Sequence, residues 1–496
     1  MKKTTEALLI IAGVVLATSA LSAALVWRSA DAAGGATTSV RPAAAQVDAT
    51  PSGDVVHYGA GYRYEANGWT FLHIEGKPYA RGYQHGRLMA AEIGDFRRTV
   101  EHIVPIDTGR DWAYFVRAAS ILWSGKKQRE YIQEMKGIAA GATSAGTPLS
   151  WREVLAINGE MELLGYWYPG IQSGAYTLGA DKEHCSAFIA TGSYTKGGKV
   201  VMAHNDWDHF VTGQFARVVL DIEPSRGHHM IMQSFPGCIA SMTDYFVTDA
   251  GLMGTETTIG DFDKYDPTKM PEFFRMRRAT QYADTLDQWV AIMRKGNNGG
   301  YANSWLLADS HTNEIMRFEQ GLKYDSVERT SDGYFVGFNG ATDNKIRDLE
   351  CGGDPTFFNV GTATGARRVR LTQLMQQYKG SIDVEVAKTI LADHYDVYLE
   401  EADNPCSRTV CGHYDVDPFQ YWQARRPYSP QGSVDGKVMD SDMAKQLSFS
   451  ARWGRACGTP FVAADFFAAH PQWNYLEGYL DDRPTQPWTV FKADPL

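Results

Sequence analysis

The segment from residue 184 to residue 209 constrains the fold most, because its pattern predicts a β-hairpin that carries reactive side chains. Residues 186–191 and 200–203 form two short apolar runs, and Lys196-Gly197-Gly198-Lys199 between them is a turn signal. The two runs should therefore fold back on each other as antiparallel strands. Cys185 begins the first strand and faces the polar end of the second.

Side chains alternate along the second predicted strand, so two different sets could face the thiol of Cys185. If the turn is centred between residues 196 and 198, residues 208–210 lie opposite Cys185, and His204 and Asp206 lie a few positions along. The two sets are His204, Asp206 and Asp208 on one face, and Asn205, Trp207 and His209 on the other. The alternation alone does not decide which set meets the thiol.

A cysteine at the start of a strand, followed by a hairpin that returns polar side chains, is typical of an N-terminal nucleophile hydrolase, in which the chain cuts itself before the nucleophile. The predicted cut lies between His184 and Cys185 and releases an α-amino group. With a pKa of about 7.7 to 8.0, this amine accepts the thiol proton near neutral pH. Cys185 would then supply both nucleophile and base. The alternative is a buried structural cysteine.

Five blocks between about residues 184 and 460 resemble the phospholipase B-like family and, more distantly, the penicillin acyltransferase group of self-processing hydrolases. In chain order the blocks are Cys185-Ser186-Ala187 with His204-Asn205-Asp206-Trp207, Ser234-Phe235-Pro236-Gly237 with residues 254–260, Gly300-Tyr301-Ala302-Asn303-Ser304-Trp305, Cys406 to Cys411 with Tyr414-Asp415, and Asp435-Gly436-Lys437-Val438 with Ala444. The resemblance implies an α+β fold, the four-layer αββα sandwich of N-terminal nucleophile hydrolases with a helical N-terminal prefix. It also implies a secreted, self-processed hydrolase that removes acyl groups from phospholipids.

The resemblance assigns roles to individual residues. Asn303 is the predicted oxyanion donor, because its amide donates without carrying charge. His204 would orient the amine and thiol or move a proton, and Asp206 would hold the new ammonium group. Arg367 would bind a substrate carboxylate or phosphate, and Trp207 is a second predicted substrate-binding residue. Each residue also has a structural alternative. Asn303 could cap a turn, His204 could be an ordinary hydrogen-bonded histidine, and Asp206 could be a turn or solvated carboxylate. Arg367 could belong to a solvated basic face.

Two departures from the family pattern leave the substrate open between esters and amides. Asp206 stands where the family has Thr, which is closer to the acyltransferase and bile-salt-hydrolase relatives. Residues 82–86 and 153–158 also resemble the prefix of the acyltransferase group. The alternative to a phospholipase is therefore an N-acyl amide or peptide amidohydrolase, or an acyltransferase, of the same superfamily.

The N-terminus predicts export. Lys2-Lys3 precede an apolar stretch over residues 7–26, and small residues follow at 30–32, so residues 1–32 are typical of a signal peptide or an uncleaved signal anchor. Residues 33–53 have the composition of a linker. The prefix would span residues 54–184 and the catalytic fragment residues 185–496. We expect a secreted, periplasmic or extracellular protein, membrane-anchored if the signal is not removed.

Cysteine usage adds one predicted disulfide. The six cysteines stand at positions 185, 238, 351, 406, 411 and 457, and Cys406 with Cys411 makes the easiest loop in an oxidising compartment. Setting Cys185 aside leaves five, so at least one other thiol should be free or buried. No spacing is a CxxC pair, so a finger-type zinc site is not expected. We predict no metal and no cofactor.

Composition and charge narrow the partners. The chain is 44% hydrophobic and 21% charged, typical of a folded body. Its formal net charge is −10, and no basic run combines with an aromatic ladder, so a nucleic-acid partner is not expected. The predicted partners are an acyl-bearing small molecule or phospholipid, and the chain's own N-terminal fragment, which should stay packed after cleavage. Contact with a membrane surface is left open.

Hydrophobic periodicity predicts mainly helices before residue 185 and mainly strands after it. Gly82 and Gly86 share one face of a helix predicted over residues 80–96, where another backbone could pack closely. Ser150 and Glu153 form a capping box. The other predicted elements are a strand over 67–75, an interrupted helix over 111–140, strands over 218–222, 230–233, 245–247 and 305–308, and helices over 366–378 and 384–393.

Two rival functions start from the same residues. The run from His204 to His209 is similar to the His-x-His-x-Asp-His element of metallo-β-lactamase-type hydrolases, with Asp206 in place of the second histidine. Clustered His and Asp side chains can bind divalent metals, so His204, Asp206, Asp208 and His209 are the candidate ligands of a metal-dependent hydrolase. That enzyme would be sensitive to chelators and insensitive to thiol alkylation. The second rival is a secreted binding protein that kept the fold without turnover.

Overall fold

Two large sheets organise the chain. The computed structural model describes residues 46–171, 185–242, 245–418 and 427–494, and over these residues one sheet has eight strands and the other ten. The order in the first sheet is β1 (Gln46–Asp48), β18 (Trp488–Lys492), β17 (Ser448–Trp453), β16 (Asp435–Asp440), β6 (Gly198–His209), β5 (Cys185–Gly192) and β14 (Gly333–Gly337), with β15 (Gln431–Ser433) also paired to β6. The order in the second sheet is β13 (Asp325–Thr330), β12 (Glu314–Gln320), β11 (Asn303–Asp309), β10 (Leu252–Thr258), β9 (Phe246–Thr248), β8 (Met230–Ser234), β7 (Val218–Pro224), β4 (Trp69–Gly76), β3 (Gly61–Ala66) and β2 (Val56–Tyr58).

The two sheets face each other across a buried interface. A side chain at Gly337 of β14 would meet the Thr257 side chain of β10 at 2.6 Å, and the Arg317 guanidinium of β12 lies 5.1 Å from the ring centroid of Phe335 in β14. Ala187 and Ile189 of β5 join the same apolar cluster as the second sheet. These residues define the inner face of the first sheet, the face that also carries Cys185.

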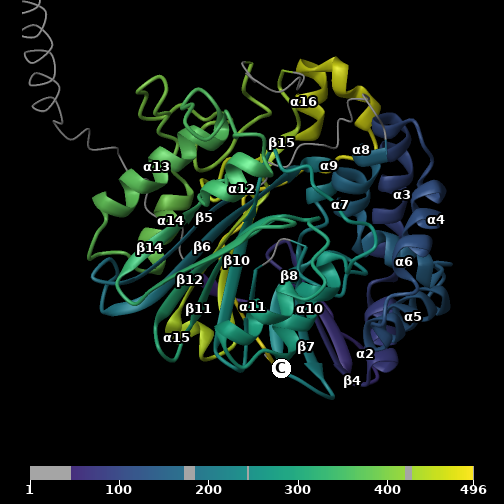
Figure 1. Cartoon of the computed structure of the whole chain (residues 1–496). Helices are drawn as coiled ribbons and strands as arrows, with labels where there is room; N and C mark the ends of the chain where they lie inside the picture. Colours follow the sequence, from purple (N-terminus) through teal and green to yellow (C-terminus); the bar gives the residue numbers. More distant parts are fainter. Residues whose placement is uncertain (1–45, 172–184, 243–244, 419–426, 495–496) are drawn as a thin grey trace, which may run out of the picture. The chain divides into compact units, whose positions relative to one another are not determined.

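Helices cover the outer face of each sheet. Phe188 and Ala190 of β5 point the other way and pack with apolar residues of α13 (Ala363–Gln377) and α14 (Val384–Leu391). On the second sheet, Trp289 of α11 (Leu286–Arg294) lies 4.8 Å, between ring centroids, from Trp305 of β11. Figure 1 shows α13 and α14 on one side of the strands and α10 and α11 on another. The other helices after residue 185 are α9 (Phe210–Gly213), α10 (Glu272–Tyr282), α12 (Asn344–Leu349), α15 (Ser441–Ala444) and α16 (Ala463–Ala469).

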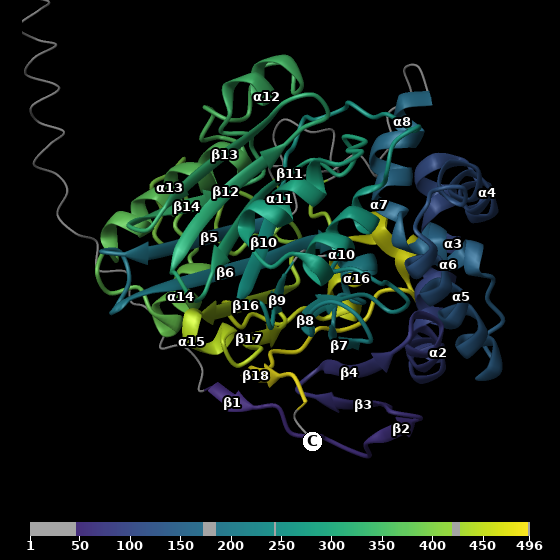
Figure 2. The same cartoon turned by 60° about the horizontal axis from the view of Figure 1, so that its bottom comes forward.

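Residues before Cys185 are built into the second sheet. Strand β4 pairs in parallel with β7 from Thr70–Val218 to Gly76–Pro224, and Figure 2 shows β4, β3 and β2 following β7 in turn. Parallel neighbours need a long crossover, and here the helices between β4 and β5 lie within it. These helices are α2 (Pro78–Leu88), α3 (Ala90–Thr108), α4 (Trp112–Trp123), α5 (Arg129–Ser144), α6 (Trp151–Asn158), α7 (Glu160–Glu162) and α8 (Tyr168–Ile171).

Glycines let two of these helices pack backbone to backbone. A Cβ atom at Gly86 of α2 would lie 1.9 Å from the carbonyl oxygen of Ile138 in α5, and one at Gly82 would lie 2.0 Å from that of Glu134. The predicted close approach at Gly82 and Gly86 is thus confirmed. The predicted capping box at α6 is also present, with Ser150 Oγ accepting from the Glu153 amide at 3.2 Å and Glu153 Oε2 accepting from the Ser150 amide at 2.8 Å.

The structure differs from the predicted elements in two places. The helix predicted over residues 80–96 is two helices, because Met89 leaves helical geometry with φ −114° and ψ 20°. Part of the predicted linker is a strand, since β1 pairs in parallel with β18.

No helix of the described residues is long and apolar enough to cross a membrane. The predicted signal over residues 1–32 and the cleavage residue His184 lie outside the described residues.

Candidate active site

The hairpin of β5 and β6 forms as predicted, but with a different register. Cys185 lies opposite Asp206, and Ala187 lies opposite His204, so the prediction that residues 208–210 face Cys185 is wrong. The turn begins earlier than the Lys-Gly-Gly-Lys signal suggests, because Gly192 adopts φ +63° and pairs with Gly198 across an irregularity in the ladder. Paired residues share a face, so Asp206 and His204 are on the face of Cys185.

The thiol of Cys185 is buried beside a carboxyl group. Its side chain is 1% exposed, and Sγ lies 3.9 Å from Asp206 Oδ1. Burial, followed by the charges of Glu256 and Asp206, raises the pKa of the thiol. Burial and then the neighbouring Asp435 raise the pKa of Asp206, so this carboxyl binds a proton more readily than an exposed aspartate does.

A buried ion pair on β16 extends this polar patch across three strands. The register of β6 and β16 places Lys437 opposite His204, which puts Asp435 beside Asp206. Lys437 Nζ lies 2.7 and 2.9 Å from the two oxygens of Asp435, and Asp435 Oδ1 accepts from the Asp206 amide at 3.2 Å. Gln233 of the second sheet contacts both Lys437 and Asp435. The lysine therefore offsets the negative charge beside the thiol.

The His204 ring lies on the same face of the sheet as the thiol, two residues along β6 from Asp206. Burial, and then the charge of Lys437, lowers its pKa well below the usual range. His204 is therefore neutral near pH 7 and can act only as a neutral donor or acceptor. Among the described residues the thiol's hydrogen-bond partner is Asp206 rather than His204.

Two residues from distant parts of the chain hold the backbone of Cys185. Asn339 Oδ1 accepts from the Cys185 amide at 3.0 Å, and Asn339 Nδ2 donates to the Thr258 carbonyl at 2.9 Å. Arg367 Nη1 donates to the Cys185 carbonyl oxygen and, at 2.9 Å, to Asn339 Oδ1. Together they fix the nitrogen and the carbonyl of the residue that carries the thiol.

Arg367 and Trp207, predicted to bind substrate, are placed behind the nucleophile instead. Arg367 is fully buried, and its guanidinium lies 4.1 Å from the ring centroid of Trp207. Trp207 is also fully buried and packs with Ala363 and Tyr414. The alternation along β6 explains this placement, because Trp207 is on the opposite face from Asp206. Both side chains support the strand that carries Cys185.

Asn303, the predicted oxyanion donor, is held in the second sheet beside Glu256. It is buried at the start of β11, opposite Thr258. With its amide nitrogen donating, Nδ2 lies 2.8 Å from Glu256 Oε2 and 2.9 Å from the Ala302 carbonyl oxygen. Thr257 faces the first sheet, so Glu256, its neighbour in the strand, points to the other face. The role of Asn303 as oxyanion donor stays a prediction.

The predicted metal-binding set does not assemble. His204, Asp206 and Asp208 share one face of β6, while His209 alternates to the other. Within the described ranges, the groups of His, Cys, Asp and Glu with ligand atoms close enough for one ion lie elsewhere.

The predicted disulfide is also wrong for this structure, in which Cys406 and Cys411 are free. Cys406 Sγ lies 3.7 Å from Asp396 Oδ2 instead.

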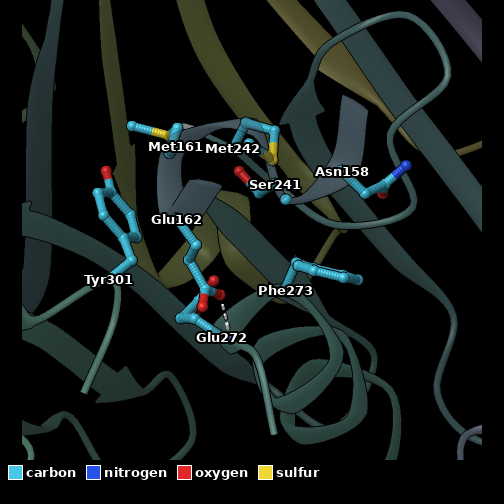
Figure 3. A pocket seen from close by; sticks show the side chains of 9 residues that line it. Asn158, Met161, Glu162, Ser241, Met242, Glu272, Phe273 and Tyr301 are labelled. Atoms are coloured by element: carbon cyan, nitrogen blue, oxygen red, sulfur yellow. Dashed lines mark hydrogen bonds between the residues drawn. The ribbon is translucent and has the colours of Figure 1, made fainter. Parts of the chain in front are cut away.

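A small pocket lies beyond the Glu256 side of the second sheet. Its cavity volume is about 10 Å³, roughly the space of one water molecule, and Figure 3 shows the Glu162 carboxylate pointing toward Glu272 within it. Tyr301, which lines the pocket, donates to Glu256 Oε1 at 3.2 Å. Burial raises the pKa of Glu162 to about 7 and that of Glu272 to about 8. The other lining residues are Asn158, Gly159, Met161, Ser241, Met242 and Phe273.

The site also contains residues from distant segments, which the sequence did not predict. Asn339 and Glu256 were not predicted as site residues, and neither were Asp435 and Lys437. The block Asp435-Gly436-Lys437-Val438 carried the only signal for the last two, because charged residues at alternate positions of a strand share one face. Asn339 sits in a left-handed conformation with φ +65°, which the sequence alone does not reveal.

Comparison with known proteins agrees with the resemblance in the sequence. Residues 127–325 match the family model described as Phospholipase B. An uncharacterized protein of Archaeoglobus fulgidus is 26% identical over 419 residues, 74% of this chain and 67% of that protein. Phospholipase B of Crotalus adamanteus is 25% identical over 297 residues, 54% of this chain and 51% of its own length. Phospholipase B-like 1 of Bos taurus is 23% identical over 365 residues, 64% of this chain and 63% of its own length.

The match to the snake protein therefore spans about half of that relative's length, and the match to the bovine protein spans less than two thirds. The matched residues 127–325 include the whole hairpin of β5 and β6 and the strands β7 to β12 of the second sheet. On these findings the chain is similar to proteins of the phospholipase B-like family, over a stretch that includes the hairpin of Cys185.

Proposed function

We propose that this chain is a phospholipase B-like hydrolase that cuts itself between His184 and Cys185 and then uses the thiol of Cys185 as its nucleophile. The observation that carries the proposal is the position of Cys185. It begins β5 with its nitrogen 3.0 Å from Asn339 Oδ1 and its sulfur 3.9 Å from Asp206 Oδ1. The two atoms that an N-terminal nucleophile needs are thus held by separate partners.

In the uncut chain, the thiol attacks the carbonyl carbon of residue 184. A carbon–sulfur bond forms, the carbon–nitrogen bond breaks, and the nitrogen becomes the α-amine of Cys185. Asp206 takes the thiol proton and passes it to this nitrogen, because its raised pKa makes it a better proton acceptor than an exposed aspartate. Water then hydrolyses the thioester, which leaves a carboxylate on residue 184 and restores the thiol.

In the cut chain, the α-amine takes over the proton transfer. Its nitrogen remains beside Asn339 Oδ1, which Arg367 holds from the other side. The thiol attacks the carbonyl carbon of an acyl substrate, the amine accepts the thiol proton, and the same proton goes to the leaving alcohol or amine as its bond to the carbonyl carbon breaks. Water then hydrolyses the thioester on Cys185, which releases the acyl group as a carboxylic acid and restores the thiol. Lys437 balances the negative charge on this face through its ion pair with Asp435.

The layer arrangement supports a fold of the N-terminal nucleophile type. Helices α13 and α14 lie on the outer face of the first sheet, and α11 lies on that of the second. We propose that this is the four-layer αββα sandwich of self-processing hydrolases, and that the exported chain acts on phospholipid esters. The contact of Asp206 with the thiol, at the position where the family has Thr, favours N-acyl amides or peptides as the second candidate substrate class.

Intact mass and N-terminal sequencing of the purified protein test self-cleavage. We expect two fragments, one beginning Cys-Ser-Ala-Phe, and a single chain from a Cys185→Ala variant. Cys238→Ala is the matched control, since Cys238 is also buried but lies on no part of the hairpin, and it should be cut normally. A folded wild-type chain that stays intact would contradict the mechanism.

The substrate class is tested separately on the cut protein. Phosphatidylcholine vesicles and N-acyl amino acids are supplied in parallel, with release of fatty acid as the readout. Release from the phospholipid that is absent in Cys185→Ala supports the phospholipase, and release only from the N-acyl amino acid supports the amidase. A cut, folded protein that releases neither would be a binding protein with the same fold.

A further inference from the structure

A second cluster of reactive side chains lies on the helix-covered side of the first sheet. His394 follows α14, Cys411 and His413 lie in the same long loop, and Cys457 follows β17. One ligand atom from each of these four residues lies within 4.8 Å of all the others. The hydrolase mechanism uses none of these residues, and the predicted disulfide involved only Cys411 among them.

The distances fit a single tetrahedral ion. His394 Nε2 lies 3.1 Å from His413 Nε2, and Cys457 Sγ lies 3.6 Å from His413 Nε2. Ligand distances of about 2.0 to 2.1 Å for nitrogen and about 2.3 Å for sulfur imply separations of about 3.3 Å between two nitrogens and about 3.6 Å between nitrogen and sulfur at a tetrahedral zinc. The two measured separations are within a few tenths of an ångström of these values.

An outer carboxylate orients one of the histidines. His394 Nδ1 lies 3.0 Å from Asp403 Oδ1, so Nδ1 carries the proton and the Nε2 lone pair points into the cluster. A carboxylate behind a ligating imidazole is the usual second layer of a zinc site. The cluster is also largely enclosed, since Cys411 and His413 are buried and only partial exposure remains at His394 and Cys457.

We propose that His394, Cys411, His413 and Cys457 form a structural site for Zn²⁺. Two thiolates and two neutral imidazoles supply four ligands, which leaves no open position for a reacting molecule, and this donor set favours zinc over magnesium or calcium. The thiolates also balance the charge of the ion. The ligands come from a loop and a strand end with no CxxC spacing, which is why the sequence gives no sign of the site.

The site would hold a loop that backs the nucleophile strand. Residues 392–417 contain no helix and no named strand, and their backbone hydrogen bonds are those of turns and isolated bridges. Asn205 Nδ2, next to Asp206 in β6, donates to the Val410 carbonyl at 3.1 Å, and Tyr414 packs on Trp207 with ring centroids 5.8 Å apart. Trp207 in turn lies under Arg367, which holds Cys185.

Metal analysis of the full chain tests the proposal independently of self-cleavage. The protein is purified without chelator, equilibrated with Zn²⁺, dialysed, and analysed for metal by mass spectrometry. We expect about one zinc ion per chain, retained in Cys406→Ser and in Cys185→Ala. Cys406→Ser is the matched control, because Cys406 is a buried cysteine of the same loop outside the cluster. Cys185→Ala separates this site from the proposed nucleophile.

Variants of the cluster should lose the metal. Cys457→Ser and His394→Ala are expected to retain less than about a tenth of the wild-type zinc, and Asp403→Asn to weaken affinity roughly tenfold. If the cluster variants fail to fold, Co²⁺ added to the metal-depleted wild type gives a second reading, through the visible spectrum of a tetrahedral thiolate complex and a rise in melting temperature. A folded wild type that binds neither ion, or one whose Cys411 and Cys457 are found joined as a disulfide, would overturn the proposal.

Discussion

The side chains around the thiol form two rows across three strands of one sheet. Cys185, Asp206 and Asp435 make one row, and His204 with Lys437 belongs to the next. Burial shifts the pKa values of these groups, raising that of Asp206 and lowering that of His204. At the residue scale, the site is therefore defined by which side chains are neighbours on one face.

Asn339 gives the sharpest single-residue prediction. Asn339→Gly removes the acceptor for the Cys185 nitrogen while the left-handed backbone at φ +65° is kept without strain. We expect self-cleavage to slow by roughly one to two orders of magnitude, as for loss of one or two positioning hydrogen bonds. The readout is the fraction of cut chain against time. Asn67→Gly, another asparagine with positive φ, is the control, and equal rates in the two variants would argue against a role for Asn339.

The acidic pair in the pocket predicts a pH dependence of stability. Unfolded glutamates lose their protons near pH 4.5, whereas folded Glu162 and Glu272 hold theirs to about pH 7 and about pH 8. Between these values the folded chain binds more protons, so the free energy of unfolding falls as pH rises, by about 1.4 kcal/mol per pH unit for each proton.

Glu272→Gln removes one of these protons, so its free energy of unfolding should fall less steeply between about pH 5 and pH 7. Urea unfolding at several pH values measures the slope. Glu477→Gln is the control because Glu477 is exposed, and this variant should keep the wild-type slope. A Glu272→Gln curve parallel to the wild type would mean that the folded chain does not protonate this group.

At the scale of elements, the crossing of α2 and α5 depends on glycine. Gly86→Ala places a methyl group 1.9 Å from the Ile138 carbonyl oxygen, and backbone cannot move aside as a side chain can. We expect the free energy of unfolding to fall by about 3 kcal/mol or more, measured by urea unfolding. Gly125→Ala is the control, since a Cβ atom there meets nothing within 4 Å. Equal stability of the two variants would show that the helices do not cross this closely.

At the scale of the whole molecule, the residues before and after the predicted cut share one sheet. Strand β4 pairs with β7 along its whole length, and both lie in the interior of the ten-strand order. Separation would expose two new sheet edges and the apolar cluster that spans both parts. We expect the two fragments of the cut protein to elute together in gel filtration and to separate only in denaturant. Separate elution in native buffer would contradict this pairing.

Short-range patterns explain which parts of the fold could be predicted from the sequence. The hairpin, the capping box at Ser150 and the close-packing face of Gly82 and Gly86 depend on residues a few positions apart. The strand β1 was missed because it depends on pairing with a distant segment, and no local pattern marks the break at Met89. Periodicity is local, whereas an edge strand such as β1 exists only through its partner β18.

The amino-acid sequence by itself determined that Cys185 starts a strand, that Asp206 and His204 share a face, and that the chain resembles the phospholipase B-like family. Only the tertiary structure decided that this face meets the thiol, because the register depends on where the turn at Gly192 begins. It also decided that Arg367 supports Cys185, that Asn339 holds its nitrogen, and that Lys437 lies beside His204. Hydrogen bonds and sheet pairing act between atoms that folding brings together, so residues more than a hundred positions apart leave no local pattern to read.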